Sequence, residues 1–164
     1  MSESTIPFIS EDAIEQAATS LNAEDAGFEK AIDELEAEQP QVLGYFFAEN
    51  TESFTQAERE YMLLLLLVVW RSIKNTGVTP PLVSADELEE AEDRNWELVQ
   101  DLPAKAFSDR LDVFFDNYPQ EDLLAFLEDA LSPDEEDDEL VTKEGREALF
   151  VSLKSVVDCW TGWS

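Results

Sequence analysis

The chain contains no histidine among its 164 residues, and Cys159 is its single cysteine. Histidine is the commonest general base, activates many nucleophiles and is the commonest metal ligand. Thiolate zinc sites need several cysteines, and an internal disulfide needs a second one. The sequence therefore predicts a protein that is not an enzyme, carries no cofactor or structural metal and occupies a reducing compartment.

Glycine is scarce, with five residues, and alternating β-branched runs are absent, which argues against a β-sandwich or barrel. No glycine-rich phosphate loop, EF-hand loop or basic patch with interleaved aromatics is present, so direct nucleic-acid binding is not expected. The first residues have no basic segment followed by an apolar run, as a signal peptide would. We therefore expect a cytoplasmic protein.

Basic residues are few: 10 Lys and Arg stand against 39 Asp and Glu, which gives a net charge of −29. Such a field repels nucleic acid and anionic membranes and attracts basic proteins. The chain is nonetheless 44% hydrophobic, so it is not a disordered acidic tail. The acidity has two interpretations: it serves binding, or it serves solubility or adaptation to a salty cytoplasm.

The longest apolar run, residues 61–70, follows a capping-box pattern that begins at Thr55 and ends at Glu58. A helix built from this run is apolar on every face, so it cannot lie with one side in water. It is too short for a bilayer, which takes about 20 apolar residues. The run predicts a central helix wrapped by others.

Apolar spacing and cap residues predict an all-α protein, a single compact domain of seven or eight helices around this central helix. Residues 1–9 are expected to form a loose lead, pinned by Ile6 and Phe8. Residues 10–164 form the domain, as two similar halves, 10–76 and 84–164, joined by a Pro-Pro loop at 77–83. Helices are expected to start near residues 10, 22, 40, 56, 84, 103, 119 and 142. In the fifth of these, the apolar residues expected on the buried side are Leu88, Ala91, Trp96, Val99 and Leu102.

The two halves also resemble each other in sequence. Residues 28–50 align on residues 107–129, with Pro40-Gln41 on Pro119-Gln120, and the alignment resumes at Thr55 and Thr142 after an acidic run. This predicts a duplicated unit of three to four helices. Its copies pack about a pseudo-two-fold axis or stack like units of a helical array. The alternative is that amphipathic helices resemble each other without common ancestry.

The last helix of the second half differs from its counterpart. It has Ser152, Lys154, Ser155 and Asp158 where the first half has Leu65, Leu67, Val68 and Arg71. This predicts an edge position for the second helix, which ends in Trp160 and Trp163. Exposed aromatics often anchor interfaces, so these residues are candidates for a homodimer contact. The other interpretation folds both side chains back onto the body.

A Thr-x-x-x-Arg-Glu pattern occurs once in each half, with Arg59 and Glu60 in the first and Arg146 and Glu147 in the second. Arginine is rare here, so the repetition suggests a role. One hypothesis is a structural ion pair with a neighbouring helix, and the other is a paired site for an anion or carboxylate. These four residues, with the two tryptophans, are the candidate interaction residues; no catalytic, cofactor-binding or metal-binding residue is predicted.

Three hypotheses for function follow. The first is a non-enzymatic, highly acidic helical module that binds a basic partner protein, without contacting a membrane. The second is a nucleic-acid mimic that blocks a DNA-binding protein, which needs carboxylates gathered on one face. The third is a protein whose acidity serves only solubility or salt adaptation.

Overall fold

The computed structural model describes residues 6–23, 27–46, 56–100, 107–115, 118–131 and 143–161, without the side chains of residues 46, 107–110 and 143–146. These ranges contain eight α-helices and no strand, which confirms the all-α prediction. The helices are α1 (Glu11–Ala23), α2 (Gly27–Glu38), α3 (Pro40–Phe46), α4 (Gln56–Lys74), α5 (Ala85–Gln100), α6 (Phe107–Phe115), α7 (Glu121–Leu131) and α8 (Lys143–Thr161).

Several helix ends follow the expected local chemistry. Ser10 Oγ accepts a hydrogen bond from the N–H of Ala13 at 3.2 Å and caps α1. Ser84 and Glu87 form the full capping box of α5, each side chain accepting from the other's backbone N–H. Gly77 lies in the turn that follows α4 and has φ 88°, a left-handed conformation that glycine adopts without strain. The capping box expected at Thr55 lies outside the described residues.

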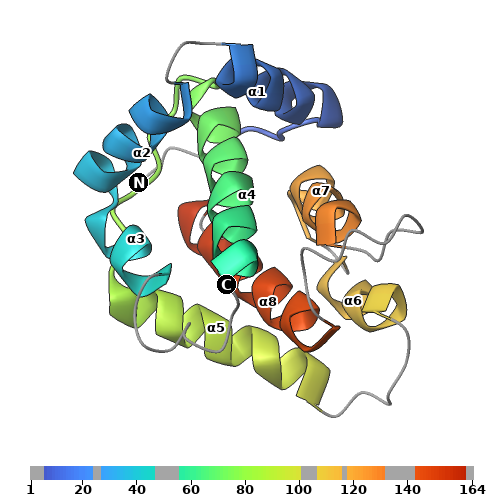
Figure 1. Cartoon of the computed structure of the whole chain (residues 1–164). Helices are drawn as coiled ribbons and strands as arrows, with labels where there is room; N and C mark the ends of the chain where they lie inside the picture. The colour runs from blue at the N-terminus through green and yellow to red at the C-terminus, as the bar shows by residue number, and fades with distance from the viewer. Residues whose placement is uncertain are drawn as a thin grey trace.

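Two buried helices cross at the centre of the molecule (Figure 1). The first is α4, in which residues 65–70 are all buried, as its composition predicts. The second is α8, in which residues 149–158 are all buried, so the expected edge position for this helix is wrong. Its buried Lys154, Ser155 and Asp158 have hydrogen-bond partners on α5, on the segment before α7 and within α8 itself, and these offset the cost of burying them.

The remaining helices form a closed ring around this pair, in the order α1, α2, α3, α5, α6 and α7 (Figure 1). Each contacts the next, and α7 returns to α1. The packing is reciprocal: α1 lies on α4 as α5 lies on α8, and α7 contacts α1 as α3 contacts α5. This reciprocity is what a pseudo-two-fold arrangement requires; a duplicated origin of the halves stays a prediction.

Gln39 connects the start of α3 to the loop that precedes α5. Its Oε1 accepts from the N–H of Val83 at 3.0 Å, and its Nε2 donates to the carbonyl of Pro81 at 2.8 Å. Gln39 is buried, so both of its polar ends are satisfied inside the protein. The Pro-Pro loop is therefore fixed by the first half of the chain as it enters the second.

Gln120, just before α7, has the same role at the other end of the molecule. Its Oε1 accepts from the N–H of Ile9 at 3.0 Å, and its Nε2 donates to the carbonyl of Pro7 at 3.0 Å. The sequence alignment paired Gln120 with Gln41, whereas its hydrogen bonds make it the counterpart of Gln39. We call Gln39 and Gln120 the glutamine clamps.

The clamp at Gln120 alters the expected picture of the N-terminal lead. Ile6 and Ile9 are buried, so this segment is held against the body from residue 6 onward. Phe8 was expected to help pin it, but its side chain is 53% exposed. Ile6 and Ile9 face the core, while Pro7 and Phe8 between them are exposed, so Phe8 falls on the outer side.

Candidate interaction surfaces

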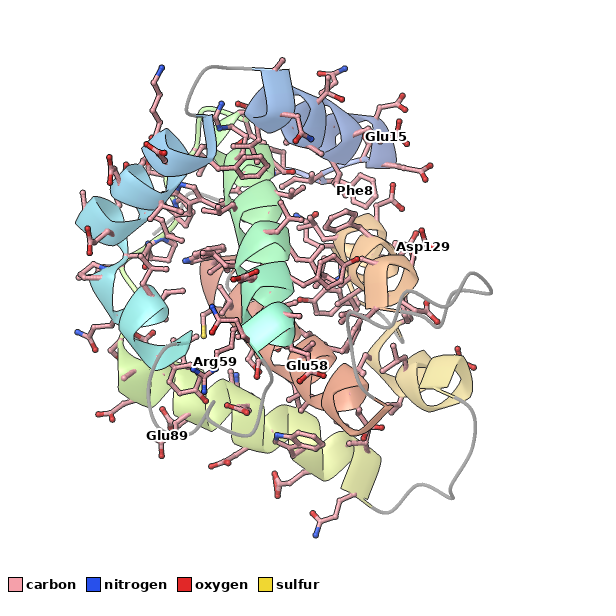
Figure 2. All side chains as sticks on the ribbon, in the orientation of Figure 1. Phe8, Glu15, Glu58, Arg59, Glu89 and Asp129 are labelled. Carbon is pink, nitrogen blue, oxygen red and sulfur yellow. The ribbon has the colours of Figure 1, made fainter. Side chains whose placement is uncertain are left out.

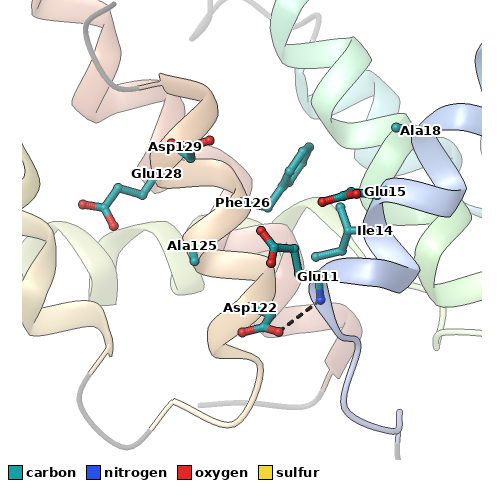
Figure 3. Close-up of a pocket in the computed structure, with 9 residues that line it drawn as sticks. All are labelled: Glu11, Ile14, Glu15, Ala18, Asp122, Ala125, Phe126, Glu128 and Asp129. Atoms are coloured by element: carbon teal, nitrogen blue, oxygen red, sulfur yellow. Dashed lines mark hydrogen bonds between the residues drawn. The ribbon is translucent and has the colours of Figure 1, made fainter.

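A groove of about 710 Å³ lies between α1 and α7 (Figure 3). Its floor includes Ile14 and Phe126, and Figure 3 shows Glu11 and Glu15 on α1 facing α7. Asp122 accepts a hydrogen bond from the N–H of Glu11 at 3.0 Å and so joins the two helices. The carboxylates that line the groove are Glu11, Glu15, Asp122, Glu128 and Asp129.

A second groove, of about 790 Å³, lies between α3 and α5. Gln41 accepts from the N–H of Ala85 at 2.8 Å, the same connection that Asp122 makes in the first groove. Its carboxylates, Glu89, Glu92 and Asp93, lie at helical spacing on one face of α5. The other lining residues are Pro40, Gly44, Tyr45 and Trp96, together with Gln41 and Ala85.

Glu92 is the central polar group of the α3–α5 groove. Its Oε1 accepts from the Tyr45 hydroxyl and its Oε2 from the Trp96 indole N–H at 3.4 Å. Burial raises the pKa of this carboxyl; the hydrogen bond from Trp96 opposes the shift, and the nearby Asp93 adds to it. The sequence predicted Trp96 on the buried side of α5, but it is 37% exposed, and Asn95 takes the buried place.

The two grooves occupy equivalent places, each between the third helix of one half and the first helix of the other. Figure 2 shows Glu15 and Asp129 on one side of the molecule and Glu89 on the opposite side. Among the described residues that line either groove there is no Lys or Arg. Both grooves are therefore sites of concentrated negative potential, where a bound cation is favoured.

Two lysines of the central helices are engaged away from these grooves. Lys74 pairs with Glu38 at 2.8 Å, and Lys154 pairs with Asp158 at 2.9 Å in the interior. The first pair ties α4 to α2, and the second lies within α8. Neither lysine lines a groove.

The repeated arginine pattern is described only in part. Glu60 is exposed and accepts a hydrogen bond from Gln56 at 3.1 Å, while Arg59, near the start of α4 in Figure 2, and Glu147 are half-buried and engaged in other interactions. The side chain of Arg146 lies outside the described residues. None of the three described side chains lines either groove. The paired anion site stays a prediction.

Trp160 is a core residue, 1% exposed, with its ring centroid 5.1 Å from that of Trp70. It cannot anchor an interface from this position, so the interpretation that folds it back onto the body is confirmed. Its indole nitrogen has no hydrogen-bond partner among the described residues. Trp163 lies outside the described residues, and the homodimer hypothesis stays untested.

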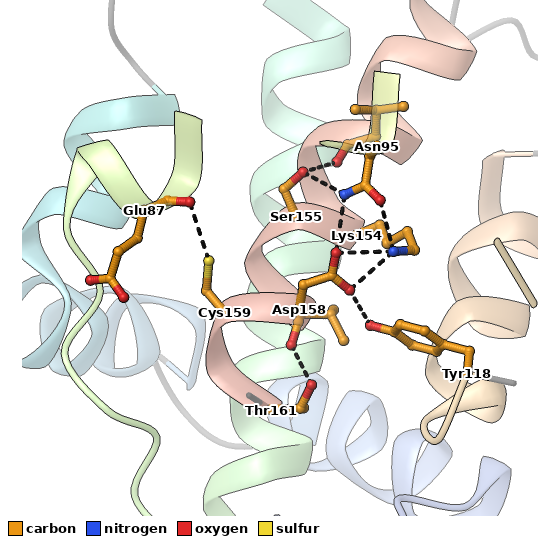
Figure 4. Close-up of polar contacts among 10 residues, drawn as sticks. Glu87, Asn95, Tyr118, Lys154, Ser155, Asp158, Cys159 and Thr161 are labelled. Atoms are coloured by element: carbon orange, nitrogen blue, oxygen red, sulfur yellow. Dashed lines mark hydrogen bonds and ion pairs between the residues drawn. The ribbon is translucent and has the colours of Figure 1, made fainter. Parts of the chain in front are cut away.

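A buried polar network connects α5, α8 and the segment before α7 (Figure 4). Lys154 donates to Asn95 at 2.8 Å and contacts both oxygens of Asp158, at 3.1 and 2.9 Å. Asn95 also donates to Ser155 at 3.0 Å, and the Tyr118 hydroxyl donates to Asp158 at 2.6 Å. All of these residues are at most 5% exposed. The network supplies the partners that make a buried charge pair tolerable.

Burial also sets the titration of the groups in and beside this network. It lowers the pKa of Lys154, against the opposing attraction of Asp158, and raises the pKa of Tyr118 well above its usual value. It raises the pKa of Cys159 to about 12, so this residue is a thiol at neutral pH. A thiol is a poor nucleophile compared with a thiolate, and the Cys159 S–H instead points to the carbonyl of Glu87 at 3.7 Å.

This network was not predicted from the sequence because Lys154, Ser155 and Asp158 were expected on an edge helix. Two signals pointed to it. Lys154 and Asp158 are opposite charges one helical turn apart within an otherwise apolar helix. Asn95 continues the buried spacing set by Leu88, Ala91 and Val99.

No protein-family model, curated protein or solved structure matches this chain. Within the described ranges, no helix has the length and apolar content needed to cross a membrane. The described side chains also contain no group of three or more His, Cys, Asp or Glu placed to hold a metal ion. Function must therefore be argued from the surfaces themselves.

Proposed function

We propose that this protein is a non-enzymatic, acidic interaction module that binds a basic partner protein through its two carboxylate-lined grooves. The observation that carries the proposal is that both grooves are lined by carboxylates and by no described Lys or Arg. Each groove also has apolar or aromatic lining, so it offers contact area as well as charge. Complementary charge speeds encounter and selects the partner, while buried contact area holds it.

The grooves account for binding better than the overall charge does. Exposed carboxylates occur on α1, α2, α5 and α7, which belong to different sides of the ring (Figures 1 and 2). A nucleic-acid mimic requires them on one face, so the described surface favours localised grooves over a mimic. Charge spread over a surface gives solubility and weak attraction, and screening by salt removes most of it.

The test compares variants of equal net charge. One pair of substitutions, Glu89→Gln with Asp93→Asn, removes charge from the α3–α5 groove. The matched control, Glu29→Gln with Asp33→Asn, removes the same charge from the exposed face of α2. Binding of a basic partner protein, recovered by its affinity for the purified protein, is then measured by calorimetry at physiological salt.

The proposal predicts that the groove variant weakens binding by about tenfold, a loss of about 1.4 kcal/mol, while the α2 variant binds as the wild type does. Equal losses in both variants would mean that net charge alone attracts the partner, and the proposal would fail. A partner that DNA displaces, and whose binding depends equally on both surfaces, would instead indicate a nucleic-acid mimic.

A further inference from the structure

The α3–α5 groove is lined by Tyr45 and Trp96, whereas the aromatic side chain described in the lining of its counterpart is the half-buried Phe126. Tyr45 and Trp96 come from different helices and both donate a hydrogen bond to Glu92, so their rings are fixed beside one carboxylate. Trp96 is partly exposed, which leaves ring surface available to a ligand. The donors to Glu92 are neutral groups, so its charge is oriented by them and not neutralised.

The charges around these rings favour a cation. Glu89 and Asp93 lie on the same face of α5 as Glu92 and Trp96, at helical spacing. A cation in this groove meets carboxylates and the negative face of an indole ring together. A guanidinium group suits both, because it is planar, stacks on aromatic rings and offers several N–H donors to carboxylate oxygens.

We propose that the α3–α5 groove seats an arginine side chain of the basic partner, stacked on Trp96 and hydrogen-bonded to the carboxylates of α5. This inference rests on the proposed function and names the group that this groove recognises. The α1–α7 groove does not share the specificity. Residues 7–10 align on residues 81–84, and the same offset continues into the following helices. Ala18 and Asn22 of α1 then fall at the positions of Glu92 and Trp96 of α5. A cation there meets carboxylates and the half-buried Phe126, but no indole ring among the described lining residues.

The test uses a lysine-rich peptide with one central arginine and two relatives in which citrulline or lysine replaces that arginine. Citrulline keeps the shape of arginine and lacks its charge. Their affinities for the wild-type protein are measured by calorimetry, and the Trp96 indole N–H resonance is followed by NMR. We expect the arginine peptide to bind more tightly than both relatives and to shift that resonance.

Two variants locate the seat. Trp96→Leu removes the ring at a partly exposed position and is expected to weaken binding of the arginine peptide by about 3- to 30-fold, bringing it level with the lysine peptide. Glu15→Gln, in the α1–α7 groove, is expected to reduce the affinity of both peptides equally. Circular dichroism and thermal unfolding verify that both variants are folded.

The outcomes separate the two proposals. If none of the peptides bound, the proposed function itself would fail. If the peptides bound with equal affinity, or if Trp96→Leu left the preference for arginine unchanged, the arginine seat would be refuted while binding of basic partners stood. A loss confined to the arginine peptide in Trp96→Leu supports the inference.

Discussion

The α1–α7 and α3–α5 grooves are built alike and lined differently. In each, a side chain at the start of one helix accepts from the first N–H of the other, Asp122 from Glu11 and Gln41 from Ala85. Residues away from these connections differ between the two grooves, as at Trp96. The difference teaches that the same backbone connections can form a groove whose exposed lining is chemically different.

The same contrast continues inside the molecule. Leu21 on α1 occupies the place that Asn95 occupies on α5, and both are buried. The α1–α4 interface at this place is therefore apolar, whereas the α5–α8 interface has the network around Lys154 and Asp158. The two halves thus have an apolar side chain and a polar network at the same place. Substitutions there should therefore change stability by different amounts in the two halves.

The largest expected effect comes from breaking the network. Lys154→Met leaves Asp158 buried without its cation, and we expect a loss of about 3–5 kcal/mol in the free energy of unfolding. Urea unfolding followed by circular dichroism measures it. The double variant Lys154→Met with Asp158→Leu removes both charges and should recover part of the loss. A single variant as stable as the wild type would show that this pair does not hold α8 in place.

The glutamine clamps test whether the two halves are equivalent. Replacing Gln120 with Ala leaves the buried N–H of Ile9 without its acceptor, and Gln39→Ala does the same to Val83. Each change should cost about 1–3 kcal/mol in the free energy of unfolding. Hydrogen exchange should show lost protection at that amide first. A large cost for one clamp and none for the other would mean that the clamps are not equivalent.

Much of the fold could be predicted because helix periodicity, caps and the apolar run at residues 61–70 are local signals. The buried position of α8 could not be predicted in the same way. Lys154 and Ser155 are polar, and their burial depends on Asn95 of α5 as well as on partners within α8. Local patterns describe how polar a segment is, and tertiary contacts decide whether that polarity is satisfied.

The candidate site was predictable in its charge and not in its shape. Each groove combines helices from opposite halves, so no contiguous segment contains it. The sequence signal for this arrangement was a second similarity, between residues 7–10 and residues 81–84. It aligns the two segments that the glutamine clamps hold. Trp96 was missed because the apolar spacing of α5 assigned it to the core. Its neighbour Asn95 proved a better fit to the buried stripe once Lys154 was there to pair with it.

The helix caps at the two clamped segments offer a finer comparison. Ser84 belongs to a reciprocal capping box with Glu87, whereas Ser10 accepts from Ala13, which has no side chain to return the bond. We expect Ser84→Ala to cost about 1 kcal/mol and Ser10→Ala to cost less, measured by thermal unfolding. Ser84→Asp, which retains the acceptor, is the control. A larger cost at Ser10 would contradict this account.

The smallest expected effect concerns the titration of Glu92. Its pKa is raised on folding, so the folded protein binds this proton more tightly than the unfolded chain does. The resulting stability is fully present below the ordinary carboxyl pKa and is lost as the pH rises through the folded value. At neutral pH the ionised carboxylate is therefore unfavourable, and Glu92→Gln should stabilise the protein by less than about 1 kcal/mol, because the group is partly solvated.

The control for this titration is Glu89→Gln, which makes the same charge change at an exposed position of the same helix. Both substitutions relieve the general repulsion in a chain of net charge −29, so only the excess at Glu92 reports its burial. Thermal unfolding from pH 4 to 8 should show this excess at neutral pH and its disappearance at the acidic end.

A bound arginine side chain has the opposite effect on Glu92, because its positive charge favours the ionised carboxylate over the protonated one. The affinity of the arginine peptide for the wild type should rise with pH over the range in which Glu92 loses its proton, and the affinity for Glu92→Gln should stay constant. A constant affinity in the wild type as well would mean that the bound cation does not contact this carboxylate.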